Sequence, residues 1–329
     1  MDLSVVVPVF NERDALPELH ARLTGVLSSL VSSYEIVLVN DASTDDSWSI
    51  ILSLASRDRH TKAIGLSRNF GHQLAITAGL DIARGDAVVL MDGDLQDPPE
   101  VIPALYAKFT DGFDVVYAQR RTREGETVWK KLTARLFYRL MRRITRLDIP
   151  VDTGDFRLMS RRVADELRRL QEHSRFLRGL VTWVGYNQTA VLYDRAARSS
   201  GSTKFSTTKM LSFAFDGITS FSSQPLRIAS QLGFFFSSLS LVVMLFLIYY
   251  ALSGGPGLVQ GWTSLIVSVL FLGGVQLIAI GLLGEYIGRI YEEVKQRPLY
   301  VVKDRLNLPA DRSAAPTAPD GGARDRSGA

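Results

Sequence analysis

The chain runs through Val88-Val89-Leu90-Met91-Asp92-Gly93-Asp94-Leu95-Gln96-Asp97-Pro98-Pro99-Glu100, where a short apolar run ends abruptly in acidic residues. Residues 86–91 predict a buried strand, because the run is too short for a buried helix and follows a glycine. Residues two apart in extended chain point to the same side, so the carboxylates of Asp92 and Asp94 can converge. Such oxygens suit Mg²⁺ or Mn²⁺, and Gln96 could add a carbonyl oxygen. The alternative is a solvated acidic turn, because Asp-Gly is common in turns.

The composition excludes several kinds of site. The chain has 329 residues, of which 46% are hydrophobic, enough for a sizeable core and roughly two domains. It has no cysteine, which rules out disulfides, thiolate zinc sites and cysteine nucleophiles. No pair among its four histidines has metal-ligand spacing, and the net charge of +4 is only mildly basic. A strand-like run begins at Leu3, so no signal peptide is expected.

Strand-like and helical segments alternate from Leu3 to Ala118. The expected strands are 3–9, 34–40, 62–66, 87–91 and 113–118, and the expected helices are 15–30, 45–56, 71–83 and 101–109. This alternation predicts an α/β fold with a doubly wound, mostly parallel sheet.

Polar residues collect where these strands end, and ligands of such sheets bind beyond the carboxyl ends of the strands. They are Asn11, Glu12, Asp41, Asp92 and Asp94. The chain has no Gly-x-Gly-x-x-Gly after its first strand and no P-loop motif, so a dinucleotide dehydrogenase and a P-loop NTPase are not expected. What remains is a nucleotide-type site that uses acidic residues and a divalent metal.

Three motifs at strand ends carry a family resemblance. Residues 7–12 (VPVFNE), 39–45 (VNDASTD) and 91–96 (MDGDLQ) resemble family 2 glycosyltransferases with a GT-A, Rossmann-like fold. The resemblance implies that a nucleotide sugar is bound by Pro8, Phe10, Glu12, Asp41, Asp92, Gly93 and Asp94. It also implies that the metal is held by Asp92 and Asp94 with help from Gln96. For Glu12 and Asp41 the alternative is helix capping, because each stands just before a helix.

A strongly basic segment follows the fifth strand. Residues 120–146 hold ten Lys and Arg, and from Thr127 apolar residues recur at helical spacing. A basic amphipathic helix is typical of membrane-surface binding, and nucleic acid is the rival partner. Nucleic acid is not expected, because two apolar segments follow and no nucleic-acid fold signature is present. Arg120 stands at the strand end near the acidic residues, where it could clamp phosphate and take part in catalysis.

The next motif narrows the resemblance. Residues 152–161 (DTGDFRLMSR), after a basic segment, look like polyprenyl-phosphate glycosyltransferases, a group that includes bactoprenol glucosyltransferases and dolichyl-phosphate mannose synthases. In that group the position of Asp155 is proposed as a catalytic base. A phosphomonoester is already largely ionised at neutral pH, so it needs positioning more than deprotonation. The alternatives are that Asp155 orients an arginine or binds sugar hydroxyls, or that it pairs structurally with Arg157 or Arg161.

A second basic motif precedes the apolar segments. Residues 198–205 (RSSGSTKF) resemble the Arg-x-x-Gly-x-Ser-Lys-Tyr motif of the same group, which implies that Arg198 and Lys204 bind phosphate near the membrane. The alternative is a basic juxtamembrane loop that binds anionic lipid. His72 also fits the family pattern, and no role is assigned to it.

The C-terminal half predicts a membrane anchor. Segments 228–252 and 262–284 are nearly free of charge, and each is long enough to cross a bilayer core of roughly 30 Å. Positive charge flanks their outer ends and not the turn between them, so both termini and the catalytic domain are expected in the cytoplasm at the inner (plasma) membrane. The expected divisions are 1–204 catalytic, 205–227 interfacial, 228–284 transmembrane, 285–308 juxtamembrane and 309–329 a disordered tail.

Together these features predict an inverting glycosyltransferase that moves a sugar, from UDP-glucose or a similar donor, to polyprenyl (undecaprenyl) phosphate. The expected catalytic residues are Asp94, Arg120 and Asp155. Two spans are too few for a pore in one chain, so they are expected to anchor the enzyme and are suited to gathering subunits into a homo-oligomer. The alternatives are a GDP-mannose-using synthase and a non-catalytic, membrane-anchored nucleotide-binding regulator.

Overall fold

The computed structural model describes residues 1–121, 153–173, 175–194, 224–253 and 262–308. Its strands are β1 (Leu3–Val9), β2 (Tyr34–Asn40), β3 (Thr61–Leu66), β4 (Ala87–Leu90), β5 (Val115–Arg120), β6 (Thr153–Ser160), β7 (Gln188–Tyr193) and β8 (Val302–Leu306). Its helices are α1 (Leu16–Leu30), α2 (Ser47–Arg57), α3 (His72–Ile82), the short η1 (Pro99–Val101), α4 (Ile102–Thr110), α6 (Arg161–Arg169), α7 (Leu177–Trp183), α9 (Gln224–Leu252) and α10 (Trp262–Val294).

These strands form one sheet in the order β7-β5-β6-β4-β1-β2-β3-β8. β1 pairs in parallel with β2 and β4, β2 with β3, and β5 with β7. β6 lies antiparallel between β4 and β5, and β8 lies antiparallel on β3 at one edge. The sheet is therefore mostly parallel, which confirms the predicted α/β class.

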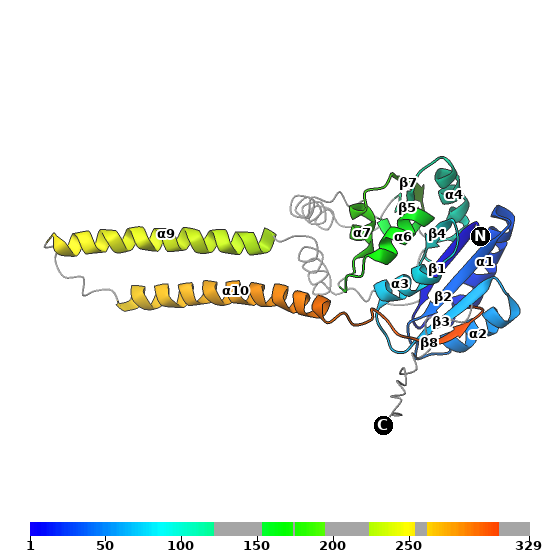
Figure 1. Ribbon diagram of the computed structural model, residues 1–329, viewed down its shortest axis with the longest axis horizontal. Coiled ribbons are helices and arrows are strands. Elements are labelled where there is room, and N and C mark those ends of the chain that lie inside the picture. Colours follow the sequence, from blue (N-terminus) through cyan, green and yellow to red (C-terminus); the bar gives the residue numbers. More distant parts are fainter. Residues whose placement is uncertain (122–152, 174, 195–223, 254–261, 309–329) are drawn as a thin grey trace, which may run out of the picture.

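Helices cover both faces of this sheet (Figure 1). One core cluster packs α1, α2 and α4 on one face, around buried residues such as Leu23 and Ile102. The other packs α3, α6 and α7 on the opposite face, around residues such as Ile76 and Leu180. Because both faces are covered, β1 and β2 are buried along their whole length. Burial on both sides explains why these strands are continuous apolar runs rather than alternating ones.

The nine elements expected before residue 120 all form, and none of their ends is more than two residues from its expected place. β6, β7 and β8 were not predicted as strands. β8 comes from the segment expected to be juxtamembrane, and it adds a largely exposed, charged edge strand (VKDRL) to the catalytic sheet. The basic amphipathic helix expected after Thr127, the interfacial segment 205–227 and the tail 309–329 lie outside the described residues.

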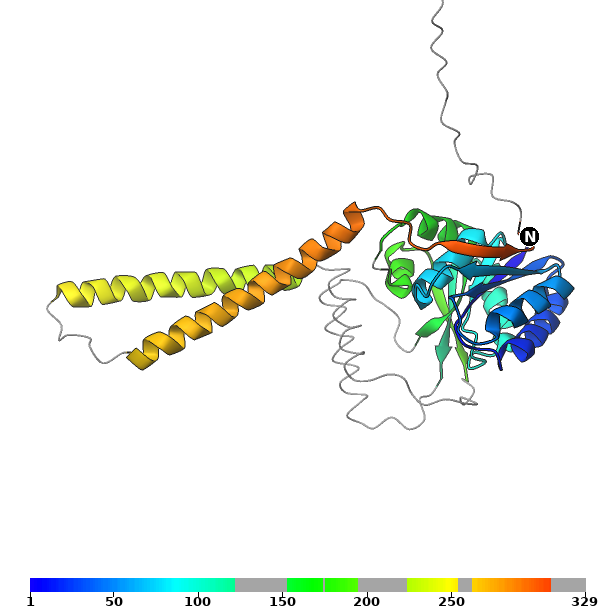
Figure 2. The same ribbon diagram turned by 90° about the horizontal axis from the view of Figure 1, so that it is seen from below.

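Two long helices, α9 and α10, extend side by side away from the α/β body (Figure 1, Figure 2). Among the described residues, one stretch is long and apolar enough to cross a membrane, Phe271–Val294 within α10. The apolar part found in α9 is shorter, Ala229–Val243. The structure thus contains one candidate membrane helix, and two membrane spans stay a prediction. α10 also continues about ten residues beyond the expected end of the second span at residue 284.

Candidate functional site

The loops that leave β1, β2 and β4 meet at the carboxyl edge of the sheet, and each holds one strained residue. Asn11, Ala42 and Leu95 have positive φ angles of 58°, 54° and 60°. This left-handed conformation is uncommon for residues other than glycine and collects at ligand-binding and active sites. The backbone strain therefore coincides with the three loops that the sequence motifs singled out.

The loops after β1 and β2 are held together by hydrogen bonds. Asn11 Oδ1 accepts a hydrogen bond from Thr44 N at 2.8 Å, and Ser43 Oγ accepts one from Asn11 N at 3.0 Å. Glu12 N donates to Ser47 Oγ at 3.0 Å, which ties the second half of the motif to the start of α2. Phe10, at the tip, is 44% exposed. The paired loops thus form a rim that presents an exposed aromatic ring, and its binding to a nucleotide stays a prediction.

Asp41 is buried and holds the loop that begins α3. Its two carboxylate oxygens accept hydrogen bonds from Phe70 N at 2.7 Å and Gly71 N at 2.9 Å. Burial raises the pKa of this carboxyl, while the two backbone hydrogen bonds oppose the rise. Helix anchoring is therefore visible for Asp41, but the helix is α3 and not the adjacent α2. Its assignment to the nucleotide stays a prediction.

The acidic loop after β4 lies close against β1. A Cβ atom on Gly93 would lie 3.3 Å from the carbonyl oxygen of Pro8, so a larger residue between the two acids would push the loop away. Asp94 Oδ1 accepts a hydrogen bond from Gln96 N at 3.1 Å, and Gln96 itself is buried. The close approach explains the glycine between Asp92 and Asp94 and fixes where both carboxylates start.

Asp92 carries the charge that its surroundings satisfy least. Its Oδ1 is buried and accepts no hydrogen bond from the described residues, and His72 Nε2 lies 3.4 Å away. Burial raises its pKa to about 6; His72 opposes this rise, and the nearby acids Asp155, Asp97 and Asp94 add to it.

These acids fit a divalent cation. The described residues contain no group of three or more His, Cys, Asp or Glu already arranged around one point. The buried Oδ1 of Asp92 nevertheless lacks a hydrogen bond, and its neighbours Asp94 and Gln96 carry further oxygen atoms. Hard cations prefer oxygen ligands and complete their shells with water and substrate phosphates. The residues present therefore suit the metal, while its binding stays a prediction.

β6 brings Asp155 to the same edge. Because β6 is antiparallel to its neighbours, its first half lies beside the ends of β4 and β5: Arg157 pairs with Leu90, and Thr153 pairs with Gln119. Asp155 is 6% exposed. One oxygen lies 3.2 Å from His72 Nε2 and 3.2 Å from Gln73 Nε2, and the other accepts from Arg178 Nε at 2.9 Å.

This environment keeps Asp155 ionised. Burial favours its neutral form, but the His72 hydrogen bond and the nearby cations Arg178 and Arg157 hold the pKa of the carboxyl well below its usual range. Arg157 Nη2 lies 3.8 Å from Asp155 Oδ1. Arg161, the other expected partner, begins α6 beyond the far end of β6. A carboxyl group whose pKa is lowered in this way is a weak proton acceptor, and the role of Asp155 as a base, as an orienting residue or as a structural partner of Arg157 stays a prediction.

Arg120 ends β5 beside this cluster. Its Nε is buried without a hydrogen bond in the described structure, and its Nη2 would lie 3.4 Å from a Cβ atom on Gly154. Tyr193, at the end of β7, donates a hydrogen bond from its hydroxyl to Asp97 Oδ1 at 2.5 Å. Burial, followed by the charge of Asp97, raises the pKa of Tyr193 to about 12, and a hydrogen bond with Arg120 opposes the rise.

The sequence analysis missed several residues of this cluster. His72 and Gln73 stood in a motif to which no role was assigned. Arg178 and Tyr193 had no local signal, because only the tertiary fold brings α7 and β7 to this edge of the sheet. At one edge of the sheet, the structure brings together Asp155 and every predicted site residue that precedes Arg120 in the sequence. Arg198 and Lys204 lie outside the described residues, so their phosphate-binding roles stay predictions.

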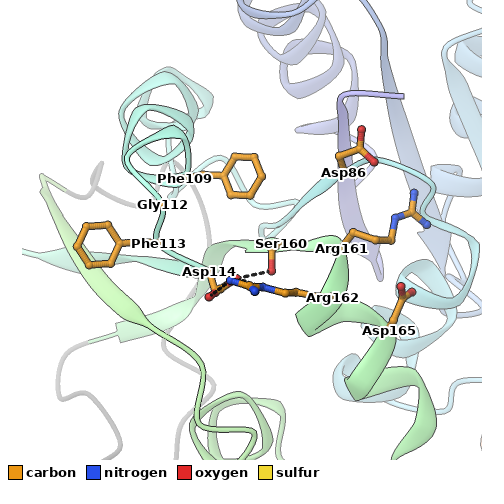
Figure 3. Close-up of a pocket in the computed structure, with 9 residues that line it drawn as sticks. All are labelled: Asp86, Phe109, Gly112, Phe113, Asp114, Ser160, Arg161, Arg162 and Asp165. Atoms are coloured by element: carbon orange, nitrogen blue, oxygen red, sulfur yellow. Dashed lines mark hydrogen bonds and ion pairs between the residues drawn. The ribbon is translucent and has the colours of Figure 1, made fainter.

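A separate hollow of about 460 Å³ opens at the opposite edge of the sheet (Figure 3). There Arg162 forms a two-pronged ion pair with Asp114, whose carboxylate also accepts a hydrogen bond from Ser160 Oγ at 3.0 Å. None of the predicted site residues lines this hollow. The hollow therefore lies away from the strand ends where the predicted site residues gather.

Comparisons with known proteins agree with the motifs. The sequence profile of glycosyl transferase family 2 matches residues 4–168. An uncharacterized glycosyltransferase of Synechocystis sp. is 50% identical over 308 residues, which are 94% of this chain and 96% of that protein. An SfII prophage-derived bactoprenol glucosyl transferase of Shigella flexneri is 46% identical over 304 residues, which are 92% of this chain and 98% of that protein. S. aureus TarS in complex with UDP-GlcNAc aligns at 17% identity with a TM-score of 0.46, covering 67% of this chain and 66% of that one.

Proposed function

The chain belongs to glycosyl transferase family 2, and on that premise we propose that it transfers a sugar from a nucleotide sugar to polyprenyl phosphate. The acceptor is supported by the Shigella flexneri relative, whose description names bactoprenol and which aligns over nearly its whole length. The same description favours glucose, with UDP-glucose as the donor to test first. The chain is a glycosyltransferase in either case.

The observation that carries the proposal is one edge of the sheet where acidic and cationic groups stand side by side. The carboxylate of Asp92 has a buried oxygen without a hydrogen bond, and it lies next to Asp155, which orients Arg178. Arg120 stands at the end of β5, the strand that neighbours β6. A reaction between a nucleoside diphosphate sugar and a phosphate brings several negative charges together. Such a reaction needs a cation site and guanidinium groups in one place.

In the proposed reaction, a bond forms between an acceptor phosphate oxygen and the anomeric carbon while the bond from that carbon to the nucleoside diphosphate breaks. A divalent cation, held by Asp92 and Asp94 with help from Gln96, would supply charge stabilisation for the diphosphate leaving group. The rim of Pro8, Phe10 and Glu12 would receive the nucleotide. Arg120, with Arg198 and Lys204, would bind phosphate, and Asp155 would hold Arg178 in place.

We place the enzyme at the cytoplasmic face of the plasma membrane, with both α9 and α10 crossing the bilayer. The candidate span Phe271–Val294 supports an anchor, and the absence of charged residues between 253 and 262 supports an outward-facing turn. A lipid-linked acceptor also requires a site beside the membrane.

The test is transfer of labelled sugar into organic-extractable lipid. Purified full-length protein is mixed with undecaprenyl phosphate and, separately, UDP-glucose, UDP-N-acetylglucosamine or GDP-mannose, with Mg²⁺, Mn²⁺ or a chelator. Metal-dependent label in the lipid from one donor is the expected result. Label from GDP-mannose alone would favour the mannose-synthase alternative. No label from any donor, with nucleotide binding intact, would overturn the polyprenyl acceptor.

A further inference from the structure

The last turn of α10 is bonded to the catalytic domain at His173. The backbone N–H of His173 donates to Glu293 Oε1 at 2.8 Å, and its ring Nδ1 lies 3.2 Å from Glu293 Oε2. Its ring Nε2 lies 2.9 Å from the carbonyl oxygen of Arg297, just beyond the helix. One histidine thus contacts both the final turn of the candidate membrane helix and the chain that leaves it.

These contacts form a specific pair. Both oxygens of Glu293 are used by His173, and both ring nitrogens of His173 face acceptors. A neutral ring donates from one of its two nitrogens, and a hydrogen bond from that nitrogen to the Glu293 carboxylate is charge-assisted. The His173 side chain is 23% exposed and the Glu293 side chain is 44% exposed, so the contact lies at the surface where the helix meets the catalytic domain.

The chain after α10 is also fixed to the catalytic domain. Tyr300 donates a hydrogen bond from its hydroxyl to Asp81 Oδ2 on α3 at 2.6 Å, and Ser67 N donates to the carbonyl oxygen of Val301 at 2.9 Å. β8 then pairs with β3. The segment from Glu293 to β8 therefore joins the end of α10 to two parts of the α/β body.

The chain segment that contacts Glu293 through His173 also contains Arg178, a residue of the candidate site. His173 lies five positions before Arg178, and the chain between them is anchored on both sides. Arg175 Nη2 donates to the carbonyl oxygen of Leu167 at 2.8 Å, and Leu177 N donates to Gln73 Oε1 at 3.0 Å. Arg178 then donates to Asp155. In Figure 1, α7 lies on the side of the body that faces the end of α10.

We propose that His173 and Glu293 are a positioning pair that sets the phosphate-acceptor side of the site, marked by Arg178, at a fixed place relative to the membrane end of α10. The inference rests on the proposed function, because only an acceptor delivered from the bilayer makes this placement matter. A lipid phosphate has a fixed depth at the membrane surface, whereas a nucleotide sugar arrives from solution. The pair should therefore affect acceptor use and not donor use.

The test measures both substrates in vesicles. Full-length wild-type protein and the variants Glu293→Gln, His173→Ala and the double variant are reconstituted into phosphatidylethanolamine–phosphatidylglycerol vesicles with varied undecaprenyl phosphate. Each single variant should raise the KM for the lipid about tenfold, the size expected from one lost charge-assisted hydrogen bond. The KM for the nucleotide sugar should stay unchanged. The double variant should be less impaired than the sum of the two single effects, because the contact between the His173 ring and the Glu293 carboxylate is lost in both.

Two matched variants control for the loss of a carboxylate and the loss of an imidazole ring at other positions. Glu292→Gln removes a carboxylate one position away, where it pairs with Lys295, and His60→Ala removes an exposed histidine far from α10. Both should behave as wild type. Wild-type transfer with an unchanged lipid KM in Glu293→Gln and His173→Ala, or an equal rise in both KM values, would overturn the positioning pair alone. An inactive wild type would instead overturn the proposed acceptor, and the acceptor role of the pair with it.

Discussion

At the scale of the residue, Asp92 holds a charge that the folded protein disfavours. Burial raises its pKa to about 6, from 3.8 in the unfolded chain. An acid whose pKa is raised by folding binds its proton more tightly in the folded state. The metal-free protein should therefore lose stability as pH rises from about 4 to about 6, and should stay less stable above that range.

The variant Asp92→Asn should separate stability from activity. It removes a carboxylate whose ionisation opposes folding by about 3 kcal/mol at neutral pH, so the metal-free variant should melt several degrees above wild type. It should also lose sugar transfer. Thermal unfolding with chelator at pH 7.5 and at pH 4 tests this, because the difference should vanish at pH 4. Added Mn²⁺ should stabilise wild type and not the variant. A variant that melts lower than wild type at pH 7.5 would contradict the prediction.

Asp155 makes a second residue-scale prediction, because an orienting carboxylate and a catalytic base fail differently. Asp155→Asn leaves Arg157, which is 4% exposed, without its anionic partner, and breaking a buried pair costs about 3 to 5 kcal/mol. The variant should therefore unfold at a clearly lower temperature and bind the lipid acceptor more weakly.

Steady-state kinetics of Asp155→Asn decide between the two roles, because the loss of the buried pair with Arg157 lowers the melting temperature in either case. A base would show a fall in kcat with an unchanged KM for the lipid, whereas an orienting carboxylate would show a raised KM for the lipid. Arg178→Lys keeps a charge but not the planar geometry, so it should reproduce the acceptor defect with a smaller loss of stability.

At the scale of the element, the sequence was informative where burial is two-sided. β1, β2 and β4 are continuous apolar runs because helices cover both faces, and the polar residues after them were placed correctly at one sheet edge. β8 gave no such signal, because three of its five residues are exposed at an edge. β6 was recognised as a motif and not as a strand. Arg178 could not be paired with Asp155, because nothing local in α7 indicates an antiparallel strand next to it.

Tyr193 links two elements of the site and makes an element-scale prediction about pH. Its hydroxyl joins the end of β7 to the loop after β4 through Asp97, and its pKa is raised to about 12. Because folding raises the pKa of this tyrosine, its hydroxyl contributes its full stabilising free energy below pH ~10. That contribution is lost as the pH rises from ~10 toward 12. Tyr193→Phe should remove one late ionisation from the absorbance titration at 295 nm. A difference spectrum that titrates near pH 10 would contradict the buried contact.

At the scale of the whole molecule, the sheet constrains the membrane topology. The chain leaves the catalytic sheet after β7, runs through α9 and α10, and returns to the same sheet as β8. Both ends of the helical pair are therefore on one side of any membrane, so the number of crossings between them is even. If Phe271–Val294 crosses the bilayer, the chain between β7 and that stretch must cross an odd number of times, and α9 is the described helix in that part of the chain.

The chain has no cysteine, so single introduced cysteines can report whether the helical pair crosses the membrane twice or not at all. In intact cells, Ser253→Cys, at the end of α9, should react with a membrane-impermeant maleimide if both helices cross. Asn307→Cys, just after β8, should react only after the cells are opened. Labelling of neither position in intact cells, with both labelled after opening, would indicate a helical pair that lies in the cytoplasmic surface without crossing. That result would remove the two-span anchor while leaving the fixed connection between α10 and the catalytic sheet in place.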